Sequence, residues 1–424
     1  MAVTSAPRLM IYSQDGLGLG HLRRTTLLAS AFLAARPGGS VLTVSDSPMG
    51  QFFSTSPGHD YLKLPSIRKV GPGDWRPVSL ATPFADVKAM REKLIRVAAQ
   101  EFRPDVLLVD HMPHGAMGEL VPTLEALPHN VRTVLGLRDI VDAPPTVRRR
   151  WQVEGAFDAL KRYYHDVLVY GCREVFDVAA QYAWPADLGS RVRYCGYVCS
   201  PQPPGSPEAM RRRYLRGSPE SELVVAMAGG GADGYTLFET LLHAVPALVA
   251  ERPCRFVVVT GPFLPDAERK ELRRLAKGLP VRLVSTVDNS LSHIGCADLV
   301  VSMAGYNTTA EVLGFARRAL LVPREGPSAE QRMRASRFAE RGWVRWLPPE
   351  SLSPEMLAAS MIDALARPDP EVAQPPDLGG TERAVWHLVS RLGDDVLNGS
   401  LGPVTVNGHR NIGAATGTGS GGHP

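Results

Sequence analysis

The sequence predicts an α/β protein of two doubly wound, Rossmann-like domains that face each other across a cleft. Apolar runs of strand length at 8–13 and 221–227 are each followed by a glycine-rich turn and then by helix-forming sequence. Repeats of this unit build parallel sheets with helices on their faces. The length of 424 residues suits two domains of ordinary size. The stiff, proline-rich segment 200–207 marks the boundary between them.

Composition limits the class of protein. The chain is 44% hydrophobic and 21% charged with a net charge of +4, which does not indicate a nucleic-acid binder. Its five cysteines are scattered without a C-x-x-C pair, so they predict neither disulfides nor a zinc site. No apolar run reaches membrane-spanning length, and the N-terminus lacks the apolar core of a signal peptide. We therefore expect a cytoplasmic protein.

In the first half, apolar runs of strand length alternate with stretches that favour helices. The Pro/Gly-rich stretch 66–85 is too irregular for a regular element. It is either a loop that contacts a second substrate, here called an acceptor loop, or an ordinary surface crossover. The helix predicted at 86–100 has one apolar face, formed by Val87, Met90, Leu94 and Val97. The predicted strands cover residues 8–13, 41–44, 61–64, 105–109, 131–137, 166–170 and 191–195.

The second half repeats the pattern and ends in a polar tail. A final amphipathic helix is predicted at 381–392, and the Gly/Thr/Ser/Asn-rich tail beyond it is predicted to be disordered. Its predicted strands cover residues 221–227, 255–260, 281–284, 297–301 and 320–322. The predicted divisions of the whole chain are 1–199, a linker at 200–207, 208–370, a last helix within 371–395, and a tail at 396–424.

The first glycine-rich turn ends in a histidine. A P-loop would need Gly-Lys-Ser/Thr where this chain has His21 and Leu22, and a dinucleotide loop needs G-x-G-x-x-G rather than the G-x-G-x-G found here. An imidazole at the positive end of a helix is held neutral and can act as a base. The alternative is a histidine that caps the helix beside a structural turn. We expect Gly18 and Gly20 of this turn to line the acceptor site.

Polar residues follow two further strands of the first half, at the sheet edge where open α/β sheets bind ligands. Asp110 and His111 come after the strand at 105–109, and Arg138 and Asp139 follow the next one. We take them as candidates for the acceptor site. Alternatively, Asp110 caps the next helix and Arg138 pairs with a nearby carboxylate.

The second half contains two features suited to a phosphorylated ligand. Three consecutive glycines, Gly229, Gly230 and Gly231, form a turn whose backbone N–H groups could cradle a pyrophosphate. Further on, Gly305 stands between a strand and a helix, so the helix N-terminus also faces this edge. Glu311 lies in the first two turns of that helix, where its carboxylate could accept two adjacent hydroxyls, as on a ribose.

The segment 305–311 and the pair Glu330–Gln331 resemble the donor-sugar-nucleotide signature of family 28 glycosyltransferases. The resemblance covers residues 222–347 well and the first half loosely. It implies the two-domain GT-B fold, with a last helix that crosses back to the first domain. In the family, the matching glutamate holds the ribose and a Gln-Gln pair holds the sugar, whereas this chain has Glu330 in place of the first Gln. The donor-binding residues so implied are Gly229, Gly230, Gly231, Val287, Gly305, Asn307, Thr308, Glu311, Glu330 and Gln331.

The resemblance also implies a chemistry. A hexose or N-acetylhexosamine would move, with inversion, from a UDP-sugar to an acceptor hydroxyl, with His21 as the base and Asp110 as a second catalytic residue. Glycine turns and helix ends can stabilise the leaving diphosphate without a metal, and the chain contains no Asp-x-Asp metal motif. We expect no cofactor, no metal and no nucleic-acid partner. The acceptor, whether small molecule, glycan or lipid-linked, and any peripheral membrane contact stay open.

Three other functions are alternatives to a glycosyltransferase. A nucleotide-sugar 2-epimerase shares the architecture, and Asp110, Asp139 and Glu330 could serve its proton transfers. A non-catalytic, transferase-like partner protein should lack a base, and His21 counts against it. A dehydrogenase is disfavoured by the spacing of the glycines.

Overall fold

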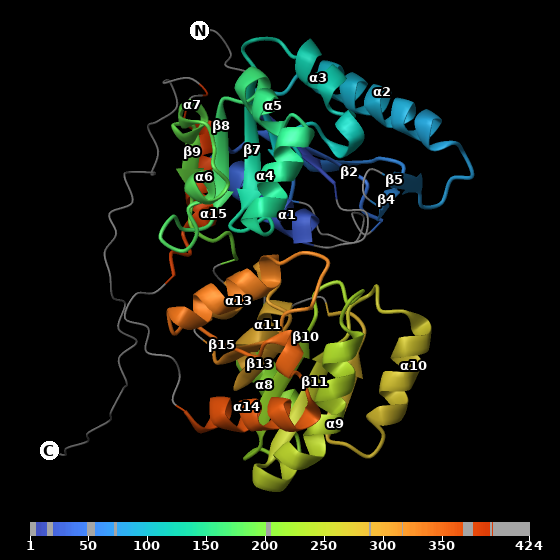
Figure 1. Ribbon diagram of the computed structural model, residues 1–424, viewed down its shortest axis with the longest axis vertical. Coiled ribbons are helices and arrows are strands. Elements are labelled where there is room, and N and C mark those ends of the chain that lie inside the picture. Colours follow the sequence, from blue (N-terminus) through green and yellow to red (C-terminus); the bar gives the residue numbers. More distant parts are fainter. Residues whose placement is uncertain are drawn as a thin grey trace, which may run out of the picture.

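The computed structural model describes residues 6–14, 20–48, 56–71, 74–200, 205–287, 290–315, 317–367, 376–390 and 392. Two parallel sheets, each covered by helices, form two domains that are stacked along the long axis of the molecule (Figure 1). The predicted tail at 396–424 and most of the predicted linker, residues 201–204, lie outside the described residues.

The N-terminal sheet has seven parallel strands in the order β3-β2-β1-β6-β7-β8-β9. The strand order reverses between β1 and β6, which is the switch point where open α/β sheets bind ligands. Its strands are β1 (Arg8–Ser13), β2 (Ser40–Ser45), β3 (His59–Lys63), β6 (Val106–Asp110), β7 (Arg132–Arg138), β8 (Asp166–Tyr170) and β9 (Val192–Tyr194). The helices between them are α1 (Gly20–Ala35), α2 (Phe84–Phe102), α3 (Val121–Ala126), α4 (Pro144–Val153), α5 (Ala156–Tyr163), α6 (Val178–Gln181) and α7 (Ala186–Gly189), with a 3₁₀ turn at Ala116–Gly118.

The C-terminal sheet has six parallel strands in the order β12-β11-β10-β13-β14-β15. Its switch point lies between β10 and β13. The strands are β10 (Glu222–Met227), β11 (Cys254–Val259), β12 (Val281–Val284), β13 (Leu299–Ser302), β14 (Ala319–Leu321) and β15 (Arg345–Trp346). The helices are α8 (Pro207–Tyr214), α9 (Tyr235–Glu251), α10 (Asp266–Leu275), α11 (Ser290–Cys296), α12 (Tyr306–Gly314), α13 (Glu330–Glu340) and α14 (Pro354–Ala366), with a 3₁₀ turn at Pro349–Ser351.

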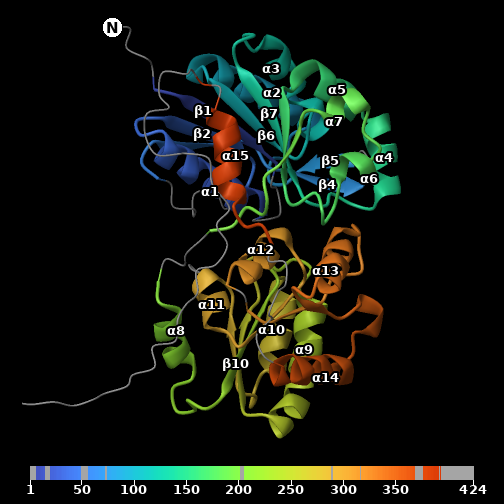
Figure 2. The same ribbon diagram turned by 90° about the vertical axis from the view of Figure 1, so that its left-hand side faces the viewer.

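The last helix, α15 (Gly380–Val389), returns to the first domain, as predicted. It packs against α1, and Figure 2 shows the two helices side by side. One apolar cluster joins Leu28 and Phe32 of α1 to Val385 and Leu388 of α15, and it continues into the second domain. The crossing helix therefore ties the two ends of the described chain to one core.

The stretch 66–85, predicted to be irregular, contains a β-hairpin. Its antiparallel strands are β4 (Ile67–Gly71) and β5 (Asp74–Pro77). Ile67 is buried and Trp75 packs beside it against the start of α2. This prediction was wrong because those two apolar side chains hold the hairpin in place despite the surrounding prolines and glycines.

The prediction of the apolar face of α2 was wrong for three of its four residues, since only Val87 is buried. Met90, Leu94 and Val97 are exposed at 44%, 36% and 52%. The buried face instead contains Arg91, whose guanidinium bonds both oxygens of the buried Glu119 at 2.6 Å. Because Arg91 is charged, a pattern that counts only apolar residues does not identify this face as the buried one. The buried face consists of Val87, Arg91, Ile95 and Ala99.

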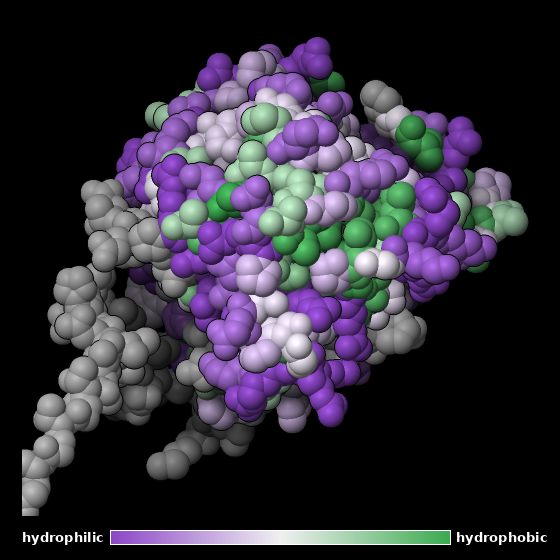
Figure 3. Space-filling view, turned by 90° about the horizontal axis from the view of Figure 1, so that it is seen from below, coloured by the Kyte–Doolittle hydropathy of each residue, from purple (hydrophilic) through white to green (hydrophobic). Residues whose placement is uncertain are grey.

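The end of the molecule farthest from the first domain is mainly hydrophilic, with a band of hydrophobic residues across it (Figure 3). Val249 of α9 and Met356 of α14 are among the exposed apolar side chains of the second domain. Scattered exposure of this kind is normal for a folded protein. Among the described residues, no helix is both long and apolar enough to cross a membrane.

Candidate functional site

The first turn of α1 carries a buried acid–histidine pair. Ser13, the last residue of β1, is aligned with Asp110 at the end of β6, so α1 starts beside this carboxylate. The Nδ1 atom of His21 lies 2.6 Å from Oδ2 of Asp110. Because the carboxylate can only accept, the hydrogen must be on Nδ1. In the neutral tautomer that carries this hydrogen, the Nε2 atom of His21 has the lone pair that a general base requires.

Arg24 completes this group and was not predicted. One turn after His21, its Nη2 atom lies 2.9 and 2.8 Å from the two oxygens of Asp110. Burial alone would raise the pKa of Asp110, but Arg24 and then His21 lower it by more, and the net pKa lies below the ordinary value. Asp110 is thus a permanent anion that orients His21. The alternative role of Asp110 as a helix cap is not needed to explain its contacts.

His111 lies next to this pair. Its ring centroid is 5.5 Å from that of His21, and its φ of 80° is in the left-handed region. Burial, and then the charge of Arg138, lowers the pKa of His111 well below its ordinary value. The ring is therefore neutral, and its Nδ1 atom is buried without a hydrogen-bond partner in the described part of the chain. Gly18 lies outside the described residues, whereas Gly20 begins α1.

The second domain presents Glu311 to the same helix. Glu311 lies on α12 with 2% of its side chain exposed, and its Oε1 atom is 2.5 Å from Nη2 of Arg23. Burial raises the pKa of Glu311 to about 7, although Arg23 opposes the shift. Nearby, the side-chain amide of Asn307 donates to the carbonyl of Gly20 at 2.9 Å. The start of α1 thus joins the predicted base to the predicted donor site.

The glycine turn after β10 is packed too closely for any other residue at one position. Gly231 has a φ of 88°, and a Cβ atom there would lie 1.9 Å from the carbonyl oxygen of Thr260. Gly229 also has a positive φ, of 59°. The turn stands at the carboxyl end of β10, level with Gly305, which caps α12. These two glycine-bearing turns and Thr308 therefore lie on the edge where the sheet switches direction.

Three other predicted residues meet across the domain boundary. Arg138 of β7 lies 2.8 Å from Glu330 at the start of α13. Asp139 receives two bonds, of 2.9 and 2.6 Å, from Arg334, and both side chains are about 1% exposed. Arg138 therefore does pair with a carboxylate, as its alternative reading held. Arg334 was not predicted, although its four-residue spacing from Glu330 places both on one face of α13.

The two remaining donor candidates contact other parts of the protein. The side chain of Gln331 accepts from the backbone of Arg324 at 3.2 Å. Val287 is half-buried and packs against the core cluster. The two residues that follow it, Asp288 and Asn289, lie outside the described residues.

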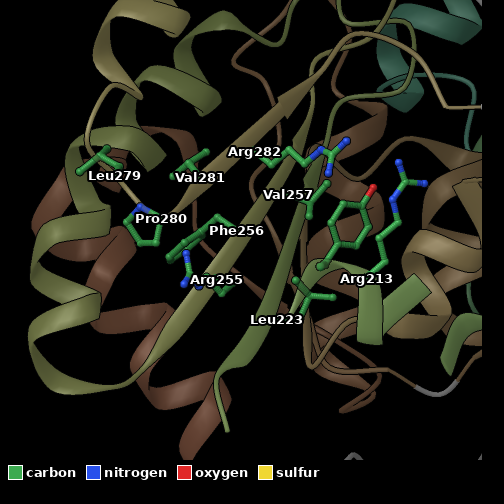
Figure 4. A pocket seen from close by; sticks show the side chains of 10 residues that line it. Arg213, Leu223, Arg255, Phe256, Val257, Leu279, Pro280, Val281 and Arg282 are labelled. Atoms are coloured by element: carbon green, nitrogen blue, oxygen red, sulfur yellow. The ribbon is translucent and has the colours of Figure 1, made fainter. Parts of the chain in front are cut away.

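One cavity of about 180 Å³ lies away from this site. It is lined by Leu223, Phe256 and Val281, near the amino ends of β10, β11 and β12, with three arginines around it (Figure 4). None of the predicted site residues lines it. Because open sheets bind ligands at the carboxyl ends of their strands, this cavity is not the candidate site. Among the described residues, no group of His, Cys, Asp or Glu could hold a metal ion.

The fold is that of the GT-B glycosyltransferases. The crystal structure of Acinetobacter baumannii MurG matches with a TM-score of 0.54 at 16% identity, over 91% of this chain and 99% of that one. A putative UDP-N-acetylglucosamine 2-epimerase from Listeria monocytogenes matches with a TM-score of 0.61 at 12% identity, over 91% and 96%. At these identities the likeness establishes the fold alone.

Residues 224–376, most of the second domain, match the glycosyltransferase family 28 C-terminal domain. The resemblance seen in the sequence is therefore confirmed for this part of the chain. A UDP-N-acetylglucosamine–N-acetylmuramyl-(pentapeptide) pyrophosphoryl-undecaprenol N-acetylglucosamine transferase from Natranaerobius thermophilus is 26% identical over 151 residues, 35% of this chain and 40% of that protein. An uncharacterized glycosyltransferase from Methanopyrus kandleri is 26% identical over 211 residues, 47% and 54% of the two chains. The match thus spans about two fifths to one half of these relatives.

Proposed function

We propose that this protein is a metal-independent, inverting glycosyltransferase that uses a UDP-linked hexose or N-acetylhexosamine. The observation that carries the proposal is the placement of α1. Its first turn holds His21 against Asp110 and, two residues later, contacts Glu311 of the family 28 domain. The first turn of α1 therefore carries His21, the proposed base for the acceptor substrate, and contacts Glu311, the proposed partner of the ribose hydroxyls.

The donor would lie along the carboxyl edge of the second sheet. The turn containing Gly229 and Gly231 offers backbone N–H groups to the diphosphate, and the N-terminus of α12 adds its positive end. Glu311 would bind the ribose, and Glu330 and Gln331 the sugar. The backbone N–H groups and the positive end of α12 would stabilise the charge that develops on the leaving diphosphate, which is the role a metal has in other transferases.

The reaction would be a single displacement. The Nε2 atom of His21 takes the proton of the acceptor hydroxyl while that oxygen bonds to the anomeric carbon. The bond from the anomeric carbon to the phosphate oxygen breaks, and the nucleoside diphosphate leaves with the electron pair. Because the acceptor attacks opposite the leaving group, the anomeric configuration inverts. Asp110 keeps the imidazole in the required tautomer and stabilises the imidazolium that forms.

The contacts favour a transferase over an epimerase of the same fold. An epimerase would need carboxyl groups that exchange protons near the sugar. In this structure Asp110 pairs with Arg24, Asp139 with Arg334, and Glu330 with Arg138. Arg24 and His21 hold the pKa of Asp110 below its ordinary value, so Asp110 is a poor proton donor at neutral pH, and the other two carboxylates are engaged in ion pairs.

The acceptor is proposed to be lipid-linked, with the first domain in peripheral contact with a membrane. Met90, Leu94 and Val97 are exposed along α2, and Val78 and Leu80 are exposed beyond the neighbouring β5. Exposed apolar groups on adjacent elements are typical of interaction surfaces. The test is sedimentation with vesicles of mixed anionic and neutral lipids. Wild type should co-sediment and a variant with serine at the three α2 positions should not; equal binding by both proteins would contradict the contact.

The test of the activity is turnover of a panel of nucleotide sugars. A true donor at 100 times its dissociation constant should stabilise the protein by about 2.7 kcal/mol in thermal unfolding. With that donor, slow transfer to water should release UDP and a sugar of inverted anomeric configuration. An epimerised nucleotide sugar with no release of UDP would contradict the transferase and identify an epimerase.

A further inference from the structure

An arginine of the first domain lies in the donor site of the second. Arg23 belongs to α1, yet its Nη2 atom is 2.5 Å from Oε1 of Glu311 and 2.5 Å from the hydroxyl of Ser290. Both partners are on helices of the C-terminal domain, α12 and α11. The contact is anchored one turn earlier, where Asn307 bonds the carbonyl of Gly20. Arg23 is therefore the point at which the first domain reaches the predicted ribose site.

Glu311 depends on this contact for its charge. Among the described residues, Arg23 from α1 contacts Glu311 directly, and the same guanidinium also contacts the hydroxyl of Ser290 at the start of α11. Cys199, from the segment between the domains, interacts with Glu311 electrostatically. Burial raises the pKa of Cys199 to about 12, so this thiol is neutral. Arg23 is thus the cation that offsets the burial of Glu311 within the described part of the chain.

The contact also leaves one acceptor atom of Glu311 unpaired. The second oxygen of Glu311, Oε2, is buried and has no hydrogen-bond partner in the described part of the chain. An ionised carboxylate has about four acceptor positions, so it can bind Arg23 and two hydroxyls at once. A protonated carboxyl loses acceptor capacity and makes weaker bonds, because bonds to a charged acceptor are about twice as strong as neutral ones.

We propose that Arg23 is a positioning residue of the donor site, supplied by the opposite domain, which keeps the Glu311 carboxylate charged and oriented to bind both hydroxyls of the nucleotide ribose. This inference rests on the proposed donor site. It follows that the donor pocket is complete only when α1 lies against α12. Donor binding and the seating of the second domain on the first are therefore coupled through one ion pair.

The inference predicts a pH dependence. The pKa of Glu311 is raised to about 7, so the affinity for a donor should rise with pH as this carboxyl ionises. Removing Arg23 takes away the charge that lowers the pKa, so the rise should move to higher pH. A lysine at this position should restore most of the effect, since it keeps the charge.

The experiment is calorimetric titration of UDP-glucose from about pH 6 to about pH 8.5, a range in which its diphosphate diester has no ionisation of its own. The proteins are wild type, Arg23→Ala, Arg23→Lys and Arg36→Ala. Arg36 follows α1 and bonds the carbonyl of Ala35, so it serves as a matched control. Near pH 7 we expect Arg23→Ala to bind roughly 10- to 100-fold more weakly, with the loss shrinking as pH rises, and the other two variants to stay near wild type.

Two results would overturn the inference. One is wild-type affinity of Arg23→Ala at every pH. The other is an equal loss at every pH with an unmoved midpoint, which would indicate a purely structural role. The variant Glu311→Ala separates this failure from failure of the donor site. If Glu311→Ala loses affinity and Arg23→Ala does not, only the proposed role of Arg23 is contradicted. If neither variant loses affinity, the proposed donor site is contradicted as well.

Discussion

At the scale of single residues, the candidate site is a set of charges that satisfy one another. Asp110 is paired with Arg24 and hydrogen-bonded to His21, and Glu311 is paired with Arg23. The sequence could predict His21, Asp110 and Glu311, because glycine turns and strand ends mark the edge where a site forms. It could not predict Arg23, Arg24 or Arg334, since the spacing of an arginine does not reveal which carboxylate from a distant segment it will meet.

Replacing His21 with Ala should lower the transfer rate by roughly 10²- to 10⁴-fold, the usual contribution of a general base. Donor affinity should hardly change, because the proposed diphosphate and ribose contacts belong to the other domain. Asn should rescue little, since it cannot accept the proton. Single-turnover transfer and donor titration on the same preparations check this. Transfer by His21→Ala at the wild-type rate would place the base elsewhere.

Replacing Asp110 with Asn should destabilise the fold by about 3–5 kcal/mol, because it leaves the buried Arg24 without its counter-charge. The matched control is Asp233→Asn, whose carboxylate pairs with Arg324 but is 49% exposed. This control should change the stability by about 1 kcal/mol or less. Urea unfolding at neutral pH measures both, and equal effects would contradict the burial argument.

The same pair gives a pH dependence of stability. The pKa of Asp110 is lower in the folded protein than in an unfolded chain, so its contribution is fully present above the unfolded value of about 4. The contribution is lost as the pH falls through the folded pKa. The difference in stability between wild type and Asp110→Asn should therefore shrink on acidification below about pH 4.

At the scale of elements, the alternation of strands and helices could be predicted because parallel strands are continuous apolar runs. The prediction failed where a buried ion pair interrupts the apolar pattern, as Arg91 does in α2, and where packing overrides local composition, as in the β4–β5 hairpin. In both cases the deciding partner is distant in sequence. Arg91 can be buried because two carboxylates that are distant in sequence, Glu119 and Asp46, lie beside it.

Two neighbouring residues of α2 test its orientation. Ile95 is fully buried and Leu94 is 36% exposed. Ile95→Ala should cost about 2–5 kcal/mol of stability, and Leu94→Ala markedly less, because only the first leaves a cavity in the core. Chemical denaturation measures both. A larger cost at Leu94 would show that the helix is turned the other way.

At the scale of the whole molecule, two domains with separate sheets are joined by ion pairs at their facing edges. Asp139–Arg334, Arg138–Glu330 and Arg23–Glu311 each link one domain to the other. The two-domain architecture could be predicted from the repeated strand–glycine–helix unit. The contacts between the domains could not, because they depend on the angle at which one domain sits on the other.

The proposed chemistry makes a prediction for the whole enzyme. Activity should survive an excess of EDTA, since glycine turns and helix ends are proposed to stabilise the diphosphate. The measurement is initial rate with and without the chelator. Complete loss of activity that magnesium or manganese restores would contradict the proposed mechanism.

The central claim is that the carboxyl edge of the second sheet binds a nucleotide sugar through Glu311. The most direct test is calorimetric titration of the donor found in the nucleotide-sugar panel into wild type and Glu311→Ala, with intact folding checked by circular dichroism. The account predicts that the variant binds with about 1.5–3 kcal/mol less free energy, the range for hydrogen bonds to a charged group. An unchanged dissociation constant would contradict it.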